Sequence, residues 1–493
     1  MISPMHETHP PAGPAHDDER DDALHWTGAV ELARMVRERQ VSAREVVAAH
    51  LDRIAAVDPQ VNAVVTVCAD RAMDEAAAAD ERLASGVAPG PLHGLPVAVK
   101  DTHAVAGVRT TLGSPVFADQ VPGADDLVVE RMRAAGAIVV GKTNVPEFAA
   151  GSHTFNPVFG TTRNPYALSR SAGGSSGGAA AALAAGLVPI ADGSDMGGSL
   201  RNPASFTNVV GLRPSPGRVP AWPSALPWET LSTPGPMGRS VADTALLLSV
   251  LAGPDPRAPM ALQDPGAGFA EPAPGGVRGA RVAVAPDFGG LLPVEPEVAE
   301  VVAEAAGTLE RLGASVEEAL PDFSRAEEVF RTLRAWQFHL TLGPVIEAHP
   351  GRVKESVVRN AAEGAALTGE QVGRAKEGLA ELYHRFRRFF EDYDLLLLPV
   401  SQVPPFDAGL EYPADVAGRP MGDYLEWMAS CFWVTATGCP ALSVPGGFTP
   451  DGLPVGVQMV GTHRSERRLL GCAAAFEEAT GYGRRRPHLG SAP

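Results

Sequence analysis

Three segments of the chain carry side chains suited to acyl-transfer chemistry. Lys100 ends the apolar run Leu95–Val99. Ser175 lies in the run Gly173–Gly178, and Ser199 follows two glycines, 24 positions further along. A serine hydroxyl is a weak nucleophile that needs a base, and a lysine can supply the base when burial lowers its pKa. These residue types are therefore candidates for a serine-dependent hydrolase.

Each segment taken alone also has an ordinary structural interpretation. A lysine at a strand end is often solvated, a glycine-serine run is usually a linker, and Gly193–Arg201 reads as a glycine-rich turn. The run Gly173–Gly178, however, directly precedes Ala179–Ala185, a small-residue helix that must pack tightly. A linker is therefore a poor explanation for that run.

Residues Gly136–Thr143 match the phosphate-loop pattern GxxxxGK[ST]. Such a loop must follow a strand and curl its backbone amides around phosphate. Here the four middle residues, Ala137–Val140, are themselves the best strand of the region. We therefore expect no nucleotide site, and a structural or surface role for Lys142.

Residues 173–177 match GxSxG, the nucleophile elbow of α/β-hydrolases, which must follow a strand directly. The preceding residues Asn164–Ser171 are polar and turn-like, and no signal singles out an Asp and a His for a triad. A Ser-His-Asp hydrolase is therefore the weaker alternative.

The three segments together resemble the amidase signature family. The resemblance rests on the glycine-serine run, on a D-x-G-G-S-x-R segment that ends at Arg201, and on an upstream lysine at a strand end. Further matching motifs follow in order: Gly141–Asn144, Glu147–Phe148, Gly211–Pro214, Thr233–Pro236, Gly438–Leu442 and Gly452–Gln458. The likeness runs from about residue 26 to about residue 465 and weakens between residues 255 and 430, where family members differ in substrate.

The resemblance implies a Ser–Ser–Lys triad that needs no histidine, metal or cofactor. Ser199 would be the nucleophile that forms an acyl-enzyme, Ser175 the bridging serine, and Lys100 the base. The Gly174–Ser175 peptide would be cis. Burial at the end of an apolar strand is expected to keep Lys100 neutral at working pH.

The glycines before Ser199 allow several backbone amides to turn towards one point, as an oxyanion hole requires. The predicted donors are the amides of Met196, Gly197, Gly198 and Ser199. The residues expected to support the site are Gly174, Ser176, Asp195 and Arg201. For Asp195 and Arg201 we expect a mutual structural salt bridge.

Short apolar runs that alternate with helical stretches predict an α/β fold. Strands are expected at Leu95–Val99, Ala137–Val140, Leu187–Ala191, Arg281–Ala285 and Leu395–Val400. Residues Trp26–Val57 predict two helices, the second with a capping box at Ser42 and Glu45. Glu295–Leu312 predicts an amphipathic helix, Gly253–Gly279 is a surface connector, and Ala441–Val444 with Val455–Met459 predicts a hairpin.

The fold that the resemblance implies is a single domain with a mixed central β-sheet covered by helices on both faces. We expect this domain to span residues 24–493, after a disordered tail at residues 1–23. That tail lacks the apolar segment of a secretory signal, so a cytoplasmic protein is expected.

Composition excludes several classes of partner. The chain has 41 basic and 58 acidic residues, a formal charge of −17, which would repel a phosphate backbone. No apolar run is long enough for a membrane span. The four cysteines, Cys68, Cys431, Cys439 and Cys472, show no metal-site spacing and are interpreted as buried free thiols. Assembly as a homodimer stays open.

The predicted activity is hydrolysis of a small carboxylic amide. Aryl or apolar amides, anilides and carbamates are candidate substrates, because several aromatic residues lie in or beside the variable parts: Trp222, Trp228, Trp336, Phe338, Trp427, Phe432 and Trp433. The alternative is the glutaminase subunit of a tRNA-dependent amidotransferase, although Thr332–Trp433 shows no obvious Arg and Asp pair for a glutamine head group. A scaffold without activity is a weaker alternative, because every catalytic residue type is present.

Overall fold

The computed structural model describes residues 24–490, so the predicted tail at residues 1–23 lies outside the described range. Eleven of the described strands form one sheet: β1 (Val64–Val67), β2 (Pro96–Lys100), β3 (Ile138–Thr143), β8 (Ile190–Asp195), β9 (Val210–Arg213), β10 (Thr233–Gly238), β11 (Arg281–Val284), β12 (Ser315–Glu318), β13 (Leu395–Pro399), β16 (Ala441–Phe448) and β17 (Pro454–Val460). Three small hairpins pair β4 (Phe155–Asn156) with β5 (Gly160–Thr161), β6 (Arg163–Asn164) with β7 (Ala167–Ser171), and β14 (Asp415–Val416) with β15 (Arg419–Pro420).

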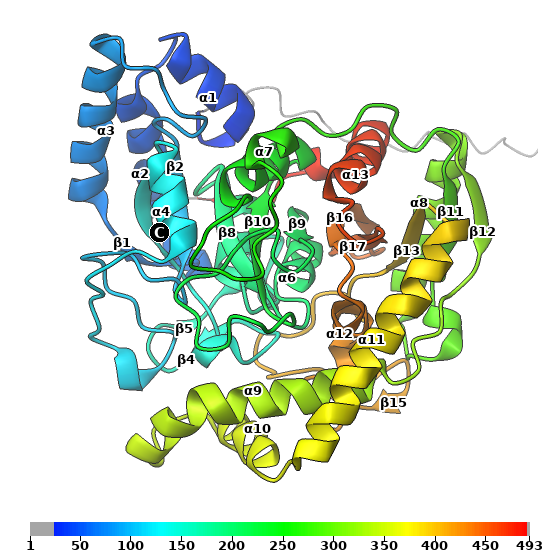
Figure 1. Ribbon diagram of the computed structural model, residues 1–493. Coiled ribbons are helices and arrows are strands. Elements are labelled where there is room, and N and C mark those ends of the chain that lie inside the picture. The colour runs from blue at the N-terminus through cyan, green and yellow to red at the C-terminus, as the bar shows by residue number, and fades with distance from the viewer. Residues whose placement is uncertain (1–23, 491–493) are drawn as a thin grey trace, which may run out of the picture.

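The described α-helices number thirteen: α1 (Ala29–Arg37), α2 (Ala43–Val61), α3 (Ala69–Ala84), α4 (Leu127–Ala134), α5 (Gly177–Ala184), α6 (Arg201–Phe206), α7 (Val241–Leu251), α8 (Pro296–Arg311), α9 (Ala326–Ala348), α10 (Glu355–Ala365), α11 (Gly369–Asp392), α12 (Ala429–Thr437) and α13 (Glu466–Thr480). Helices α9 and α10 lie at the bottom of Figure 1, and α11, which packs on α9, runs upwards from them along the right side.

The large sheet is mixed, with the strand order β1-β3-β2-β8-β10-β9-β16-β17-β13-β11-β12. Strands β3, β2 and β8 run parallel on one flank, and β13, β11 and β12 run parallel on the other. The strands between the flanks pair antiparallel. Because one sheet joins strands from both halves of the chain, the described residues form a single domain with a mixed sheet, as predicted.

Alternating side chains of the strands point to opposite faces of the sheet. In β2, Val97 and Val99 enter one hydrophobic core, which also receives residues of α1, α4, α7, α8 and α13. Ala98 enters a second core on the opposite face, shared with α2, α3 and α5. The sheet is therefore covered on both faces, and Lys100, two residues after Ala98, is directed to the face of α5.

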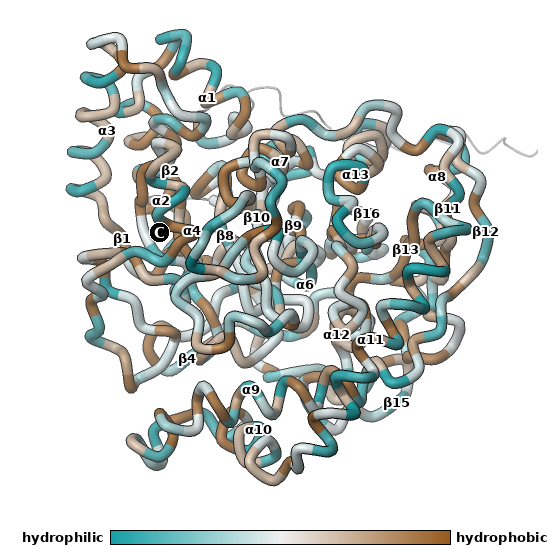
Figure 2. The backbone as a smooth tube through the Cα atoms, viewed as in Figure 1, coloured by the Kyte–Doolittle hydropathy of each residue, from teal (hydrophilic) through white to brown (hydrophobic). Residues whose placement is uncertain are grey.

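Helices at the rim bury one side only. In α11 the buried residues are Ala375, Gly378, Leu382 and Phe386, at the spacing of one helical face. Figure 2 shows hydrophilic positions along the outer parts of α3 and α11. These helices therefore pack with one face inward: α3 contacts α2 and β3, and α11 contacts α9 and α12.

Most predicted elements are confirmed. The structure has β2, β3, β11 and β13 at the expected places, the capping box of α2 at Ser42, and the hairpin of β16 and β17. The predicted amphipathic helix is α8, which begins at Pro296.

Two predictions about the neighbourhood of the serines were wrong. The strand predicted at Leu187–Ala191 begins at Ile190, after Pro189, which has no N–H to donate, and continues to Asp195 because it pairs with β10. The segment Asn164–Ser171 is the hairpin of β6 and β7, not a turn.

Lys142 lies within β3, so the strand interpretation of the phosphate-loop pattern is confirmed. The side chain is fully buried, which excludes the surface role. Its Nζ donates to Thr110 Oγ1 at 2.9 Å and to the carbonyl of His103. Lys142 therefore ties β3 to the segment that follows β2.

All four cysteines are unpaired, and three of them are buried; Cys68 is partly buried. In residues 24–490, no helix has both the length and the apolar character that crossing a membrane requires.

Candidate active site

Lys100 ends β2 and is fully buried. Its Nζ donates to Ser175 Oγ and to Ser176 Oγ, each at 2.8 Å, and to Ser194 Oγ at 3.0 Å. The ammonium group is thus surrounded by hydroxyls, with no carboxylate of the described residues in ion-pair contact. Strand β2 brings this lysine to the edge where parallel strands β2 and β8 both end, a usual position for α/β sites.

Burial lowers the pKa of Lys100 to about 7, while the negative charges of Asp192 and Asp195 act in the opposite direction. Asp192 is close because its Oδ1 accepts a hydrogen bond from the backbone N–H of Lys100 at 2.8 Å. A substantial fraction of Lys100 is therefore neutral near pH 7, as a general base requires. Asp101 does not restore the charge, because it faces Thr111 and Lys142 instead.

Ser175 and Ser176 lie directly before α5. The Gly174–Ser175 peptide is cis, as predicted. Helix α5 is buried throughout and packs close to β3: a Cβ on Gly178 would stand 2.3 Å from the backbone nitrogen of Asn144. The small residues after the serines therefore let the helix approach the sheet closely enough for both hydroxyls to reach Lys100.

Ser199 lies in the turn between β8 and α6, and it lines the same cavity as Ser175. The two segments are joined by a hydrogen bond from the Ser176 amide to the Ser199 carbonyl at 3.1 Å. Within residues 24–490 there is no hydrogen bond between the Ser175 and Ser199 hydroxyls. Such contacts are often long in unliganded sites and tighten when substrate binds.

The backbone amides before Ser199 are not equivalent. The Gly198 amide donates to Asp195 Oδ1 at 2.8 Å, so it is already occupied. The amides of Met196, Gly197 and Ser199 have no acceptor among the described residues. Gly198 has a φ of 122°, and a Cβ there would stand 2.6 Å from Cys431 Cβ, so only glycine fits.

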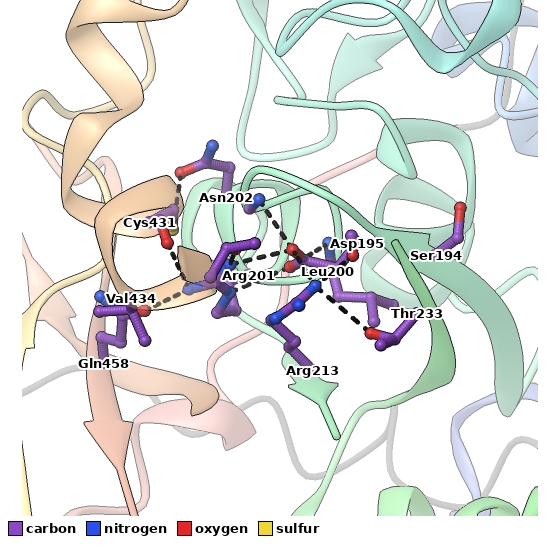
Figure 3. A network of polar contacts seen from close by, with 12 residues as sticks. Ser194, Asp195, Leu200, Arg201, Asn202, Arg213, Thr233, Cys431, Val434 and Gln458 are labelled. Carbon is purple, nitrogen blue, oxygen red and sulfur yellow. Dashed lines mark hydrogen bonds and ion pairs between the residues drawn. The ribbon is translucent and has the colours of Figure 1, made fainter. Parts of the chain in front are cut away.

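Asp195 is the centre of a buried polar network (Figure 3). Its carboxylate accepts from Arg201 at 2.9 and 3.0 Å, which confirms the predicted salt bridge, and from Arg213 at 3.3 Å. It also accepts from the Leu200 amide at 3.1 Å. Burial alone would raise the pKa of Asp195, but the two guanidinium charges hold it well below its usual range.

The same network reaches distant parts of the chain. Arg201 donates to Gln458 Oε1 at 2.6 Å in β17, to Thr435 Oγ1 at 2.9 Å in α12, and to the carbonyl of Cys431 at 3.0 Å. In Figure 3 the Ser194 side chain is directed away from this network, as expected for the neighbour of Asp195 on a strand. One strand, β8, therefore supplies a structural anchor on one side and a contact to Lys100 on the other.

A cavity of about 120 Å³ opens beside the serines. Its lining residues are Phe148, Ala149, Gly151, Ser175, Ser194, Met196, Gly197, Ser199, Ser232, Phe330, Arg334, Phe338, Tyr424, Leu425 and Met428. Of the seven aromatic residues proposed from the sequence, Phe338 alone is among them. Trp427 and Phe432 are core residues, whereas Trp222 and Trp228 are exposed.

Sequence reasoning missed several residues of the site. Ser194 contacts Lys100, Asp192 holds its backbone, and Arg334 and Tyr424 line the cavity. The alternation of β8 was the available signal for Ser194 and Asp192, because it places them on one face and Asp195 on the other. Arg334 and Tyr424 have no local signal, since tertiary contacts bring them to the serines.

The Ser-His-Asp alternative lacks its histidine. Within residues 24–490, no histidine makes a hydrogen bond to Ser175, Ser176 or Ser199. His153, the histidine near the glycine-serine run, bonds through Nδ1 to Ser171 Oγ at 2.7 Å and through Nε2 to the Ala408 carbonyl at 3.1 Å.

Comparison with known proteins agrees with this geometry. The family model for amidases matches residues 45–470. An acylamidase of Rhodococcus erythropolis is 36% identical over 94% of this chain and 98% of that protein. A glutamyl-tRNA(Gln) amidotransferase subunit from Moorella thermoacetica is 38% identical over 95% of this chain and 100% of that protein.

The crystal structure of a bacterial aryl acylamidase of the amidase signature family superposes with a TM-score of 0.87 and 31% identity, over 94% of this chain and 98% of that one. The family match, the full-length relatives and the shared fold all agree. The chain belongs to the amidase signature family and is a hydrolase that acts on amide carbon–nitrogen bonds.

Proposed function

We propose that this amidase works through an acyl-enzyme on Ser199, with Ser175 as the bridging serine and Lys100 as the general base. The observation that carries the proposal is the buried Lys100 Nζ, 2.8 Å from Ser175 Oγ, beside a cavity that Ser199 also lines. A lysine with a pKa of about 7 can accept a proton near neutral pH.

In the acylation step, Ser199 Oγ attacks the carbonyl carbon of the amide. Its proton passes to Ser175, whose own proton passes to Lys100 Nζ. The carbonyl oxygen becomes an oxyanion and accepts hydrogen bonds from the amides of Met196, Gly197 and Ser199. The carbon–nitrogen bond then breaks, and the leaving nitrogen takes a proton back through Ser175.

Deacylation repeats the relay with water. Lys100 removes a proton from water through Ser175, the hydroxide attacks the acyl ester, and Ser199 recovers its proton as the carboxylic acid leaves. Ser176 and Ser194 hold the lysine Nζ in place. Because the Gly198 amide is bound to Asp195, its role is to fix the turn rather than to bind the oxyanion.

The substrate that fits the cavity has an aryl or apolar body. Phe148, Phe330, Phe338 and Met428 supply most of the apolar wall. The similarity to an acylamidase and to an aryl acylamidase supports anilides as first substrates.

A fluorophosphonate probe, followed by digestion and mass spectrometry, tests the proposal. Label is expected on Ser199, and Ser199→Ala should lose both the label and anilide hydrolysis. Ser85→Ala is the matched control, since it removes an exposed hydroxyl at the end of α3, which takes no part in the relay. Label on Ser175 or Ser176 in the wild type would refute the assignment.

A second candidate is the glutaminase component of an amidotransferase. The observation in its favour is the 38% identity to one such protein over nearly the whole chain. Against it, no acidic side chain is among the described residues that line the cavity, so the ammonium group of glutamine would lack a counter-ion. Release of ammonia from glutamine by the chain alone, faster than release of amine from anilides, would favour this candidate.

A further inference from the structure

Arg334 is the only charged side chain among the described residues that line the cavity. It projects from α9 and is 4% exposed. A charge taken out of water is costly unless it is paired, so buried guanidinium groups normally contact a carboxylate. The proposed relay uses serines and a lysine, and Arg334 has no role in it.

The partners of Arg334 are neutral. One terminal nitrogen donates to Asn360 Oδ1 and the other to the Tyr424 hydroxyl. The guanidinium lies over the ring of Phe338, with its carbon 4.0 Å from the ring centroid. These contacts fix the plane of the group and its direction.

The acids whose charges act on Arg334, Asp423 and Glu363, have their hydrogen bonds elsewhere. Asp423 pairs with Arg331 at 2.7 Å, and Glu363 accepts from Asn360 Nδ2 at 3.0 Å. Within residues 24–490, no carboxylate forms an ion pair with Arg334. Burial lowers the pKa of Arg334, while Tyr424 and the negative charges of Asp423 and Glu363 act in the opposite direction without forming an ion pair.

The guanidinium also keeps free hydrogen-bond donors. Of its five N–H groups, the contacts above use one on each terminal nitrogen, and the remaining donors have no acceptor among the described residues. A planar pair of N–H groups matches a carboxylate in two parallel hydrogen bonds.

We propose that Arg334 is the counter-ion for a carboxylate that the substrate carries away from its scissile amide. This inference rests on the proposed function and adds the substrate class: small amides with an acidic group at one end. The serines act on the amide, the aromatic wall holds the apolar body, and Arg334 selects the acid.

The cavity should also discriminate among acidic amides. A zwitterionic amino-acid amide brings an ammonium group, for which the described lining residues offer no acid. Glutaramate, which is glutamine without its ammonium group, is therefore expected to be hydrolysed faster than glutamine.

The decisive measurement compares, on the wild-type chain, neutral and acidic substrates with the same skeleton, in which a carboxylate replaces a methyl group. For the acyl side, the pair is butanoyl 4-nitroanilide and the mono-4-nitroanilide of succinic acid. For the amine side, the pair is 4-methylacetanilide and 4-acetamidobenzoate. We expect the acid to be preferred in kcat/KM by about 10- to 100-fold in one pair, the usual range for a hydrogen-bonded charge. A preference below about 3-fold in both pairs, or for the neutral member, overturns the proposal.

Variants then assign the preference to Arg334. Arg334→Gln should abolish it by raising KM for the acid while leaving the neutral substrate nearly unchanged, and Arg334→Lys should restore part of it. Arg359→Gln, which removes an exposed charge on the neighbouring α10, is the matched control and should have no effect. An equal loss on both substrates would make Arg334 merely structural and would refute the proposal.

The two proposals fail in different ways. If the wild type hydrolyses neutral anilides with label on Ser199 but shows no preference for acids, the acidic substrate class is wrong and the serine relay stands. If Ser199 takes no label and no amide is hydrolysed, the relay itself is wrong. If Arg334→Gln does not fold, the comparison of neutral and acidic substrates on the wild-type chain still tests the proposal.

Discussion

Hydroxyl groups, not carboxylates, surround the ammonium nitrogen of Lys100. A carboxylate in contact would keep the lysine charged, whereas Ser175, Ser176 and Ser194 accept hydrogen bonds without adding charge. The acids that influence it, Asp192 and Asp195, act without touching Nζ. At the residue scale, this arrangement favours the neutral amine that the proposed general base requires.

The first prediction concerns the pH dependence of acylation. The pKa of Lys100 is lowered to about 7, so the neutral form grows as pH rises, and kcat/KM should increase through about pH 7 and level off above it. Lys100→Met keeps the volume but removes the base, and should lower the rate by about 10²- to 10⁴-fold. Single-turnover kinetics measure both. Unchanged acylation in Lys100→Met with the same pH profile would exclude Lys100 as the base.

At the element scale, close packing of α5 against the end of β3 positions the serines beside Lys100. The helix is built from glycine and alanine, and the two serines that meet Lys100 directly precede it. Gly178 has no room for a side chain, because backbone atoms of Asn144 stand within 2.6 Å of the place of a Cβ. The glycine-serine run is therefore part of a tightly packed interface.

The second prediction compares two glycines in helices. Gly178→Ala should destabilise the fold by about 1–3 kcal/mol, because the new methyl group must displace backbone, and should reduce activity by moving Ser175. Gly373→Ala in α11 meets nothing within 4 Å and should instead stabilise by roughly 0.5–1 kcal/mol, as alanine does in a helix. Urea unfolding and anilide kinetics give both values. Equal effects at the two positions would contradict the packing argument.

Across the whole molecule, the network of Asp195 joins segments that are far apart in the chain. Arg201 connects β8 and the turn of Ser199 to α12 and β17, and Arg213 adds β9. The turn that holds Ser199 is thus fixed by residues from both halves of the sequence. Loss of the network should affect stability and activity together.

The third prediction tests this coupling. Arg201→Met removes one of the two positive charges that pair with the buried Asp195 carboxylate. The free energy of unfolding should therefore fall by about 3–5 kcal/mol. The exposed pair of Arg387 and Glu391 in α11 is the control, and Arg387→Met should cost at most about 1 kcal/mol.

The stability that Asp195 contributes should decrease in acid. Because the pKa of Asp195 is depressed in the fold, its stabilisation is fully present above the unfolded pKa of about 3.9 and is lost as pH falls through the folded value. Denaturant unfolding at pH 7 and in acid measures this contribution. If Arg201→Met matched the wild type in stability and in Ser199 labelling, the network would not be needed to hold the turn.

The sequence by itself determined the features that local patterns encode. Short continuous apolar runs located β2, β3, β11 and β13, and Ser42 with Glu45 identified the start of α2, because apolar runs and helix caps are local properties. The glycine-serine run and the D-x-G-G-S-x-R segment marked the two serines of the proposed relay through their resemblance to the amidase signature family.

Only the tertiary structure decided how the site is surrounded. The length of β8 depended on its pairing with β10, so a local reading ended it before Asp195. The Gly198 amide was predicted as an oxyanion donor but instead donates to Asp195. That hydrogen bond depends on the folded turn, which the sequence pattern did not indicate. Arg334 and Tyr424 reach the cavity from residues far along the chain, because the packing of α9 against α12 is set by the whole core. The wall of the cavity therefore depends on long-range packing, whereas the residues proposed for the chemistry lie in short motifs that the family resemblance marked.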